Sequence, residues 1–275
     1  MTRLKVALIQ MRVVDKKEEN LKKAAAMIGK AAEMGVELAV LPEMFNCPYQ
    51  NDKFPLYAEK EGGPSWEKLA GLALEHRLFL VGGSVPELDE QGLVYNTSYV
   101  FDNQGRQIAK HRKMHLFDIA VEGGQSFQES AVLSAGNAVT VFDTPYGKMG
   151  VLICYDFRFP ELSRLMVQRG AKLIIVPAAF NMTTGPLHWE LLFRARAVDN
   201  QVYTLGAAPA RDWSAHYVSY GNSIIVDPWG GIVSRLGEEE DLLVADLDLT
   251  VVEKVRRELP LLNHIRKDVY QLKEL

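Results

Sequence analysis

The sequence has 275 residues, of which 48% are hydrophobic and 24% are charged, and its formal net charge is −4. This content can bury a large core, and we expect one domain over residues 1–275. Basic residues are dispersed, which argues against a nucleic-acid-binding surface. No run approaches the roughly 20 apolar residues of a membrane span, and the N-terminus shows no export signal. With only two cysteines as well, we expect a soluble cytoplasmic protein.

Strands and amphipathic helices alternate in the first half of the sequence. A strand is predicted at Leu4–Gln10, followed by a helix that Asp15 and Glu18 open as a capping pair and that ends near Gly35. Further strands are predicted at Leu38–Leu41, Leu78–Ser84, Val94–Phe101 and Ile108–Arg112, and a second helix at Ser65–His76. The basic run Lys110–Lys113 is interpreted as a solvated turn. Residues 113–137 show no clear period, and a loop of this length favours a functional role.

The second half repeats the alternation without a linker rich in Pro, Gly or Ser. Strands are predicted at Val139–Thr144, Lys148–Cys154, Leu173–Pro177, Val202–Ala208, Ser223–Val226, Ile232–Arg235 and Leu242–Asp248, and helices at Pro160–Arg169 and Leu187–Asn200. This α/β pattern fits two sheets packed face to face with helices outside, a four-layer α-β-β-α sandwich. It fits a single doubly wound sheet equally well.

The most distinctive segment runs from Gly150 to Glu161, where an apolar run ends on Cys154 and a helix start follows. A sharp strand-to-helix turn would present the sulfur at the carboxyl edge of a sheet, near helix amide groups that favour a thiolate. Cys154 is therefore a candidate nucleophile, although a lone cysteine is often a small buried apolar residue. Cys47 has no comparable turn around it and is interpreted as structural.

Two charged side chains also follow predicted strands. Glu43 comes after the strand that ends at Leu41, and Lys113 follows the strand that ends at Arg112. Ligand sites in α/β sheets gather at such edges. Together with Cys154 they could hydrolyse an acyl compound, because the carboxylate can take the thiol proton and the ammonium can stabilise an oxyanion. Burial would raise the pKa of Glu43 and Lys113 would lower it, and the sequence does not decide between them.

Three segments resemble the signature segments of the nitrilase superfamily of carbon-nitrogen hydrolases, in the same order and spacing. They are Leu41-Pro-Glu-Met-Phe45, His111-Arg-Lys-Met-His-Leu-Phe-Asp118 and Cys154-Tyr-Asp-Phe-Arg-Phe-Pro-Glu161. The similarity extends from Leu4 to about Tyr270. It implies the four-layer α-β-β-α sandwich, with Glu43 as general base, Lys113 as oxyanion stabiliser and Cys154 as nucleophile.

The resemblance has further implications for the site and the assembly. It implies that Glu129 orients the lysine and that the backbone N–H of Tyr155 completes the oxyanion hole. It also implies a homodimer or larger homo-oligomer, paired through the helix after Cys154 and the C-terminal tail at about 249–275. No cofactor is implied. His111 and His115 are spaced like metal ligands on a helix, but the two cations between them argue against a metal.

Within the superfamily, the segments Phe180–Glu190 and Arg194–Gln201 most closely resemble the omega-amidase branch. Members of this branch hydrolyse the terminal amide of α-ketoglutaramate and α-ketosuccinamate and release ammonia. Because such a small-molecule substrate carries a carboxylate, an arginine or several polar donors should line its pocket. Four residues close in sequence to the catalytic segments are pocket candidates: Tyr49, Phe117, Phe180 and Thr183. The three aromatic side chains fit the core equally well.

Other functions remain open from the sequence. The pocket rather than the three catalytic residues selects the substrate, so hydrolysis of deaminated glutathione or of an N-carbamoyl amine is an alternative. A binding module without activity would not need Glu43, Lys113 and Cys154 together. A thiol redox sensor is disfavoured because no recognisable motif supplies a resolving cysteine for Cys154.

Overall fold

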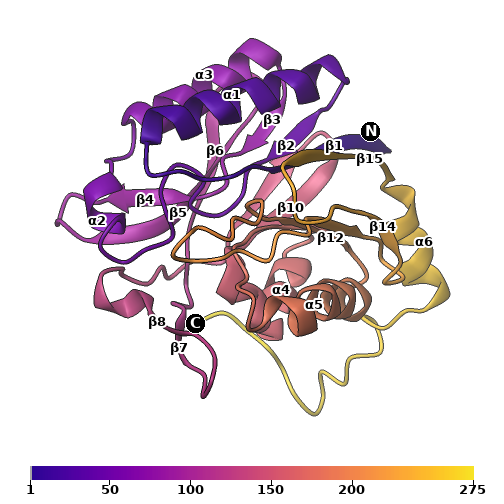
Figure 1. Cartoon of the computed structure of the whole chain (residues 1–275). Coiled ribbons are helices and arrows are strands. Elements are labelled where there is room, and N and C mark those ends of the chain that lie inside the picture. The colour runs from indigo at the N-terminus through magenta and orange to yellow at the C-terminus, as the bar shows by residue number, and fades with distance from the viewer. Residues whose placement is uncertain (1) are drawn as a thin grey trace.

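The computed structural model describes residues 2–275, and their strands form two large sheets and one small one (Figure 1). The first sheet has the order β15-β1-β2-β3-β5-β4, with β6 paired to β5. Its strands are β1 (Arg3–Gln10), β2 (Leu38–Val40), β3 (Phe79–Val81), β4 (Val85–Leu88), β5 (Val94–Phe101), β6 (Gln107–Arg112) and β15 (Asp241–Asp248). Strands β1, β2 and β3 are parallel, so their carboxyl ends lie at the same edge.

The second sheet has the order β14-β13-β12-β11-β10-β9. Its strands are β9 (Val141–Thr144), β10 (Gly147–Val151), β11 (Leu173–Pro177), β12 (Tyr203–Ala207), β13 (Ile224–Val226) and β14 (Ile232–Arg235). Here β10, β11 and β12 are the parallel strands. The small sheet pairs β7 (Asp118–Ala120) with β8 (Ser126–Gln128).

Helices cover the outer face of each large sheet. Figure 1 shows α1 (Lys17–Glu33) and α3 (Pro64–His76) on one side of the molecule, and α4 (Pro160–Gln168) and α5 (Gly185–Asn200) on the other. Along β1, Val6 and Leu8 face the core between the sheets, whereas Ala7 and Ile9 pack with residues of α1 and α3. Because residues 6–9 of β1 are buried on both faces, this part of the strand is apolar throughout. The predicted four-layer α-β-β-α sandwich is confirmed, and the single doubly wound sheet is excluded.

The start of α1 differs from the prediction. The helix begins at Lys17 after an N-cap residue that makes no side-chain cap bond. Asp15 instead accepts hydrogen bonds from the Lys53 ammonium at 2.5 Å and the Tyr57 hydroxyl at 2.6 Å. The predicted capping pair of Asp15 and Glu18 is therefore wrong, because residues distant in sequence occupy both oxygens of Asp15.

The basic run at the end of β6 is also different from the prediction. His111 and Lys113 are fully buried, while the side chains of Lys110 and Arg112 form ion pairs with Glu87 at 3.1 and 2.7 Å. Alternate residues of a strand point to opposite faces. One face of this segment therefore carries the buried His111 and Lys113, and the other carries Lys110 and Arg112, which pair with Glu87. The interpretation of residues 110–113 as a solvated turn is therefore wrong.

Several short elements were not predicted from the sequence. They are β4, β7, β8, α2 (Phe54–Tyr57) and α6 (Thr250–Glu258). The segment 113–137, which showed no period, thus contains a small hairpin followed by a 3₁₀ turn at Glu129–Ala131. Within residues 2–275, no helix is long and apolar enough to cross a membrane. The organisation of residues 1–275 as one domain stays a prediction.

Candidate active site

Glu43 lies just beyond the carboxyl end of β2, in a tightly packed turn. The following residue, Met44, has a φ of 50°, and its N–H donates to the Ser84 hydroxyl at 3.0 Å. Gly83 has a φ of 56°, and a Cβ there would lie 2.1 Å from the carbonyl oxygen of Pro42. Only glycine permits this approach. The turn that carries Glu43 is therefore held against the connection between β3 and β4, and its carboxylate is buried.

Lys113 follows β6 and brings its ammonium to two carboxylates. Its Nζ lies 2.9 Å from Oε1 of Glu43 and 2.9 Å from Oε1 of Glu129. The Tyr49 hydroxyl donates to Glu129 Oε1 at 2.5 Å and lies 3.3 Å from Lys113 Nζ. The other oxygen of Glu129 accepts the N–H of Phe117 at 2.7 Å. The described structure thus brings the side chains of Glu43, Lys113 and Glu129 together, and their catalytic roles stay predictions.

Cys154 occupies a strained turn between β10 and the short 3₁₀ helix η2 (Cys154–Arg158). Its φ is 46°, a left-handed conformation that is uncommon for a residue with a side chain. Such strain is often found at catalytic turns. The sulfur lies close enough to the Glu43 carboxyl group and to the backbone of Ala179 for both to act on its pKa. The predicted strand-to-helix turn is present, and it directs the thiol to the Glu43 and Lys113 side chains.

Burial dominates the protonation of the thiol and the base. Desolvation, aided by the neighbouring Glu43, raises the pKa of Cys154 well above its ordinary value. Desolvation also raises the pKa of Glu43, and the opposing attraction of Lys113 does not cancel it. Desolvation alone would lower the pKa of Lys113, but Glu129 and Glu43 outweigh it and raise that pKa. The resting site therefore holds a thiol and an ammonium, which differs from the expected thiolate.

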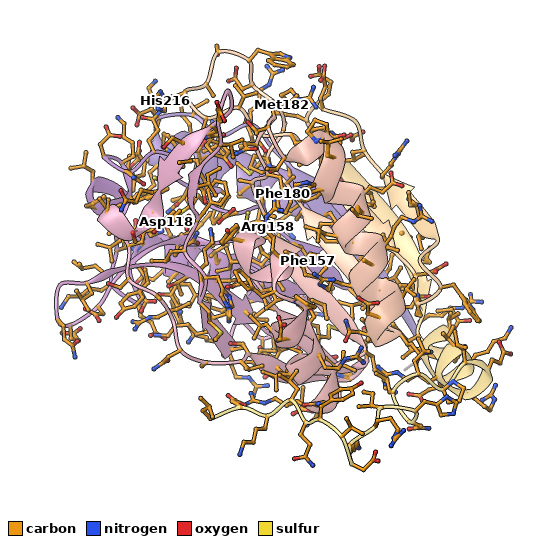
Figure 2. The ribbon with its side chains drawn as sticks, turned by 90° about the horizontal axis from the view of Figure 1, so that it is seen from below. Asp118, Phe157, Arg158, Phe180, Met182 and His216 are labelled. Atoms are coloured by element: carbon orange, nitrogen blue, oxygen red, sulfur yellow. The ribbon has the colours of Figure 1, made fainter. Side chains whose placement is uncertain are left out.

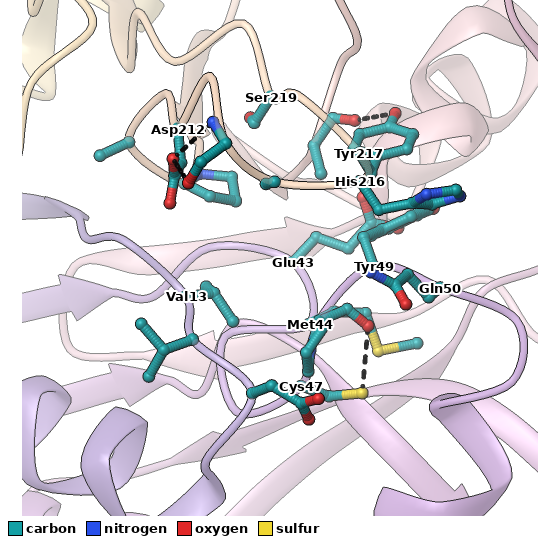
Figure 3. A pocket seen from close by; sticks show the side chains of 18 residues that line it. Val13, Glu43, Met44, Cys47, Tyr49, Gln50, Asp212, His216, Tyr217 and Ser219 are labelled. Atoms are coloured by element: carbon teal, nitrogen blue, oxygen red, sulfur yellow. Dashed lines mark hydrogen bonds between the residues drawn. The ribbon is translucent and has the colours of Figure 1, made fainter.

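A cavity of about 320 Å³ adjoins this cluster and reaches Glu43 and Tyr49 (Figure 3). Figure 3 shows Tyr217 beside them, and the Tyr49 and Tyr217 rings are 4.5 Å apart. The Tyr217 hydroxyl donates to the carbonyl oxygen of Ala179, whose backbone also contacts the sulfur of Cys154. The two rings, the backbone of Ala179 and Glu43 thus line the cavity next to the catalytic cluster.

Comparison with known proteins identifies the family. The family model for carbon-nitrogen hydrolases matches residues 5–257. The chain belongs to the carbon-nitrogen hydrolase family. It is 49% identical over 270 residues to the omega-amidase NIT2 of Mus musculus, covering 98% of each chain. The resemblance of the three sequence motifs to this superfamily is thus confirmed, and the protein is an amide-hydrolysing enzyme.

Solved structures of related hydrolases share the fold. Nit3 of Saccharomyces cerevisiae, a member of branch 10 of the nitrilase superfamily, is 46% identical, with a TM-score of 0.89 over 96% of this chain and 97% of that chain. The amidase from Nesterenkonia sp. AN1, solved as a mutant that shows the result of Michael addition of acrylamide at its active-site cysteine, is 27% identical. Its TM-score is 0.78 over 94% of this chain and 98% of that chain.

The predicted pocket residues of this hydrolase lie in three different surroundings. Tyr49 lines the cavity beside Glu43. Thr183 lines a neighbouring hollow of about 400 Å³ next to the hairpin of β7 and β8. Phe117 and Phe180 are buried, Phe117 edge-on against the Tyr155 ring at 5.2 Å. A role in substrate binding stays a prediction for all four.

Arg158 is a residue of the hydrolase that the sequence reasoning missed. Its guanidinium lies over the Phe180 ring at 4.7 Å and over the Tyr155 ring at 5.8 Å, and it contacts Nδ1 of His188 at 3.1 Å. Among the described residues these partners are two rings and an imidazole rather than a carboxylate. Figure 2 shows Arg158 beside Phe180 at the face seen from below. A signal was available, because Arg158 lies within the motif that begins at Cys154.

The hydrolase also contains a largely buried hydrogen-bond cluster centred on Asp156, a residue of the motif that begins at Cys154. The side chains of His111 and His115, weighed above as possible metal ligands, both contact the carboxylate of Asp156, at 2.9 and 2.8 Å. In the part of the chain that the structure describes, no group of three or more His, Cys, Asp or Glu side chains is arranged to hold a metal ion. The two imidazoles instead belong to a hydrogen-bond network.

Proposed function

We propose that the protein is an omega-amidase that hydrolyses the terminal amide of α-ketoglutaramate and α-ketosuccinamate to the dicarboxylate and ammonia. The proposal is supported above all by the 49% identity to the mouse omega-amidase over nearly the whole of both chains. The reaction needs a thiol, a base and an ammonium: Cys154 is near enough to Glu43 to act on its pKa, and Glu43 lies 2.9 Å from Lys113.

Acylation starts when the amide carbon meets the Cys154 sulfur. The S–C bond forms while the thiol proton passes to Glu43, and the carbonyl oxygen becomes an oxyanion. The Lys113 ammonium and the N–H of Tyr155 stabilise this charge; the first N–H groups of a helix have no partner within the helix. The C–N bond then breaks as Glu43 returns the proton to the leaving nitrogen, which departs as ammonia and leaves a thioester.

Deacylation uses the same groups in the reverse order. Glu43 removes a proton from a water molecule, whose oxygen attacks the thioester carbon. The C–S bond breaks, the acid departs, and Glu43 returns the proton to the sulfur of Cys154. The raised pKa of Glu43 suits both directions of transfer, because a general acid and base works best with a pKa near the working pH.

Glu129 acts by holding the lysine. It accepts a hydrogen bond from Lys113 Nζ at 2.9 Å and is itself fixed by the Tyr49 hydroxyl and the Phe117 N–H. A second carboxylate beside the ammonium keeps it charged, as the raised pKa of Lys113 indicates. A neutral lysine could not stabilise the oxyanion.

Arg158 is our candidate for the group that binds the substrate carboxylate. It follows Cys154 in the same motif, its guanidinium packs against Phe180, and it pairs with rings rather than with an acid among the described residues. An arginine can bind a carboxylate through two parallel hydrogen bonds. If Arg158 binds the substrate carboxylate, the Phe180 ring beneath its guanidinium lies next to the substrate, as predicted for a pocket residue.

The test is ammonia release from a panel of omega-amido keto acids, free glutamine, N-carbamoyl amines, deaminated glutathione and nitriles. We expect the keto-acid amides to lead and Cys154→Ala to be inactive. The thioester should be seen by intact mass on the wild type and on Cys47→Ala, a variant of the other buried cysteine, but not on Cys154→Ala. Faster turnover of a carbamoyl amine, with carbon dioxide as a second product, or of deaminated glutathione would overturn the substrate assignment.

We also propose that the enzyme forms a homodimer in the cytoplasm, where its two free thiols suit reducing conditions. Leu187 and Leu191 are 74% and 62% exposed on one face of α5, and Trp229 beside them is 52% exposed. An exposed apolar patch of this kind commonly marks an interface. Pairing through α4 and the tail at 249–275 stays a prediction. Light scattering should give twice the chain mass, and Leu191→Glu should give a monomer.

A further inference from the structure

Asp156 is a fully buried carboxylate that accepts hydrogen bonds from an unusually large set of donors. Its Oδ1 accepts the backbone N–H groups of Met114 and His115 at 3.1 and 2.8 Å, and it contacts Nδ1 of the His115 ring at 2.8 Å. Its Oδ2 lies 2.9 Å from Nε2 of His111 and accepts the N–H of Ile153 at 3.2 Å. A carboxylate with this many donors is held in one orientation.

These donors belong to the two segments that carry the proposed oxyanion stabiliser and nucleophile. His111, Met114 and His115 flank Lys113, which extends from β6 of the first sheet. Ile153 immediately precedes Cys154, which follows β10 of the second sheet. The Asp156 side chain thus joins the two sheets at the point where the Lys113 ammonium and the Cys154 sulfur must be placed relative to each other.

The charge of Asp156 is maintained despite burial. Desolvation alone would raise its pKa, but the hydrogen bonds from His111 and His115, together with the electrostatic attraction of His111, outweigh burial and hold that pKa well below the usual range. The two imidazoles are themselves fixed from behind. His111 Nδ1 contacts the Thr140 hydroxyl at 3.0 Å, and the His115 ring stacks on Phe159 with centroids 3.7 Å apart. The network therefore holds the Asp156 carboxylate in a fixed place.

We propose that Asp156 is a positioning residue that sets the distance between the Lys113 ammonium and the Cys154 thiol. The inference rests on the proposed roles of those two residues. Asp156 touches neither the substrate nor the reacting atoms, and it acts by fixing the backbone on both sides of the site. Since misplacement of a reacting group by about 1 Å can cost on the order of 100-fold in rate, its loss should lower kcat and leave KM nearly unchanged.

The first experiment measures kcat and KM of the purified full chain for Asp156→Asn by ammonia release. Asparagine keeps the shape but turns one of the two acceptor oxygens into a donor. We expect kcat to fall by about 100-fold and KM to change by less than about threefold. The matched control is Asp102→Asn. Asp102 is another buried carboxylate that accepts backbone N–H groups and an arginine, but in a hairpin turn of the first sheet. Its variant should lose stability without losing kcat.

A second pair of variants decides the question if Asp156→Asn fails to fold. His111→Ala removes one donor to Asp156, whereas His111→Gln can place an amide N–H where the ring Nε2 lies. The kcat of His111→Gln should be at least about tenfold higher than the kcat of His111→Ala. A loss of packing alone would not explain this difference. Wild-type kcat in folded Asp156→Asn, or in His111→Ala, would overturn the inference.

A failure of the proposed function would look different. In that case the wild type would release no ammonia from any amide, or Cys154→Ala would be as active as the wild type. An active wild type with an inactive Cys154→Ala, combined with an unaffected Asp156→Asn, would overturn only the positioning role.

Discussion

Replacing Glu129 with glutamine removes one of the two negative charges that share the Lys113 ammonium and keeps the shape of the side chain. Lys113 Nζ lies 2.9 Å from one oxygen of Glu129 and 2.9 Å from one oxygen of Glu43. Those two oxygens can therefore be no more than about 6 Å apart, a distance at which two like charges repel by about 3 kcal/mol at an effective dielectric constant of about 20. Burial is the largest cause of the raised pKa of Glu43 in the wild type, and this repulsion raises it further.

The sign of the effect follows from the role of Glu43 as base. Glu43 must be ionised to take the thiol proton, so kcat/KM rises with pH as Glu43 loses its proton. In Glu129→Gln burial still raises the pKa of Glu43, but the repulsion from Glu129 is gone, so that pKa falls. The acid limb of the pH profile should therefore move to lower pH. The plateau should fall by at least about tenfold, since a base of lower pKa is weaker and the lysine is less firmly held.

The assay is the initial rate of ammonia release at low substrate concentration, from about pH 4 to about pH 9, so that the free enzyme is observed. Glu87→Gln is the matched control, because Glu87 is also buried and paired with two cations, Lys110 and Arg112. Both variants should lose about 1–3 kcal/mol of stability, but only Glu129→Gln should move the acid limb. An unmoved limb, or one shifted to higher pH, would refute the electrostatic coupling of Glu129 to Glu43.

Three other substitutions test the remaining parts of the site. Lys113→Met should lower kcat by about 100-fold to 1,000-fold through loss of oxyanion stabilisation, and near-normal kcat would exclude that role. Arg158→Met should raise KM for keto-acid amides at least about tenfold but not KM for an uncharged amide; equal effects on both would rule out a carboxylate anchor. Tyr49→Phe removes a hydroxyl that lies 3.3 Å from Lys113 and 3.3 Å from Glu43. The same ammonia assay should show a lower kcat for this variant, and an unchanged kcat would show that the hydroxyl is dispensable.

The layer architecture was only partly accessible from hydrophobic patterning. The strands around Val6, Leu38 and Leu173 were predicted correctly, because β2 and β11 are short apolar runs and β1 has a continuous apolar stretch at residues 6–9, as strands covered on both faces do. The same pattern does not say which sheet a strand joins, so the choice of a four-layer sandwich came from the resemblance. The capping pair at Asp15 failed for a related reason, because the Lys53 side chain that binds Asp15 lies 38 residues away.

Similar reasoning explains which site residues could be found. Glu43, Lys113 and Cys154 each follow a strand, a local signal that the motifs strengthened. The burial of Lys113 could not be inferred from a basic run, because it depends on Glu43 and Glu129 approaching from segments 70 and 16 residues away. Asp156 was missed in the same way, although it lies two residues from Cys154. Its partners near His111 become visible only when the two sheets are packed together.

The charge balance of the site explains why the expected thiolate is not the resting state. Two carboxylates, Glu43 and Glu129, surround one ammonium, Lys113, so the buried cluster already carries a net negative charge when all three are ionised. A thiolate at Cys154 would add a second negative charge in a desolvated place, and the raised pKa of Cys154 expresses that cost. The sulfur therefore loses its proton only while it bonds to carbon, when the charge moves to the substrate oxygen beside Lys113. The proton held meanwhile by Glu43 is the one that ammonia needs in order to leave, which requires no external acid.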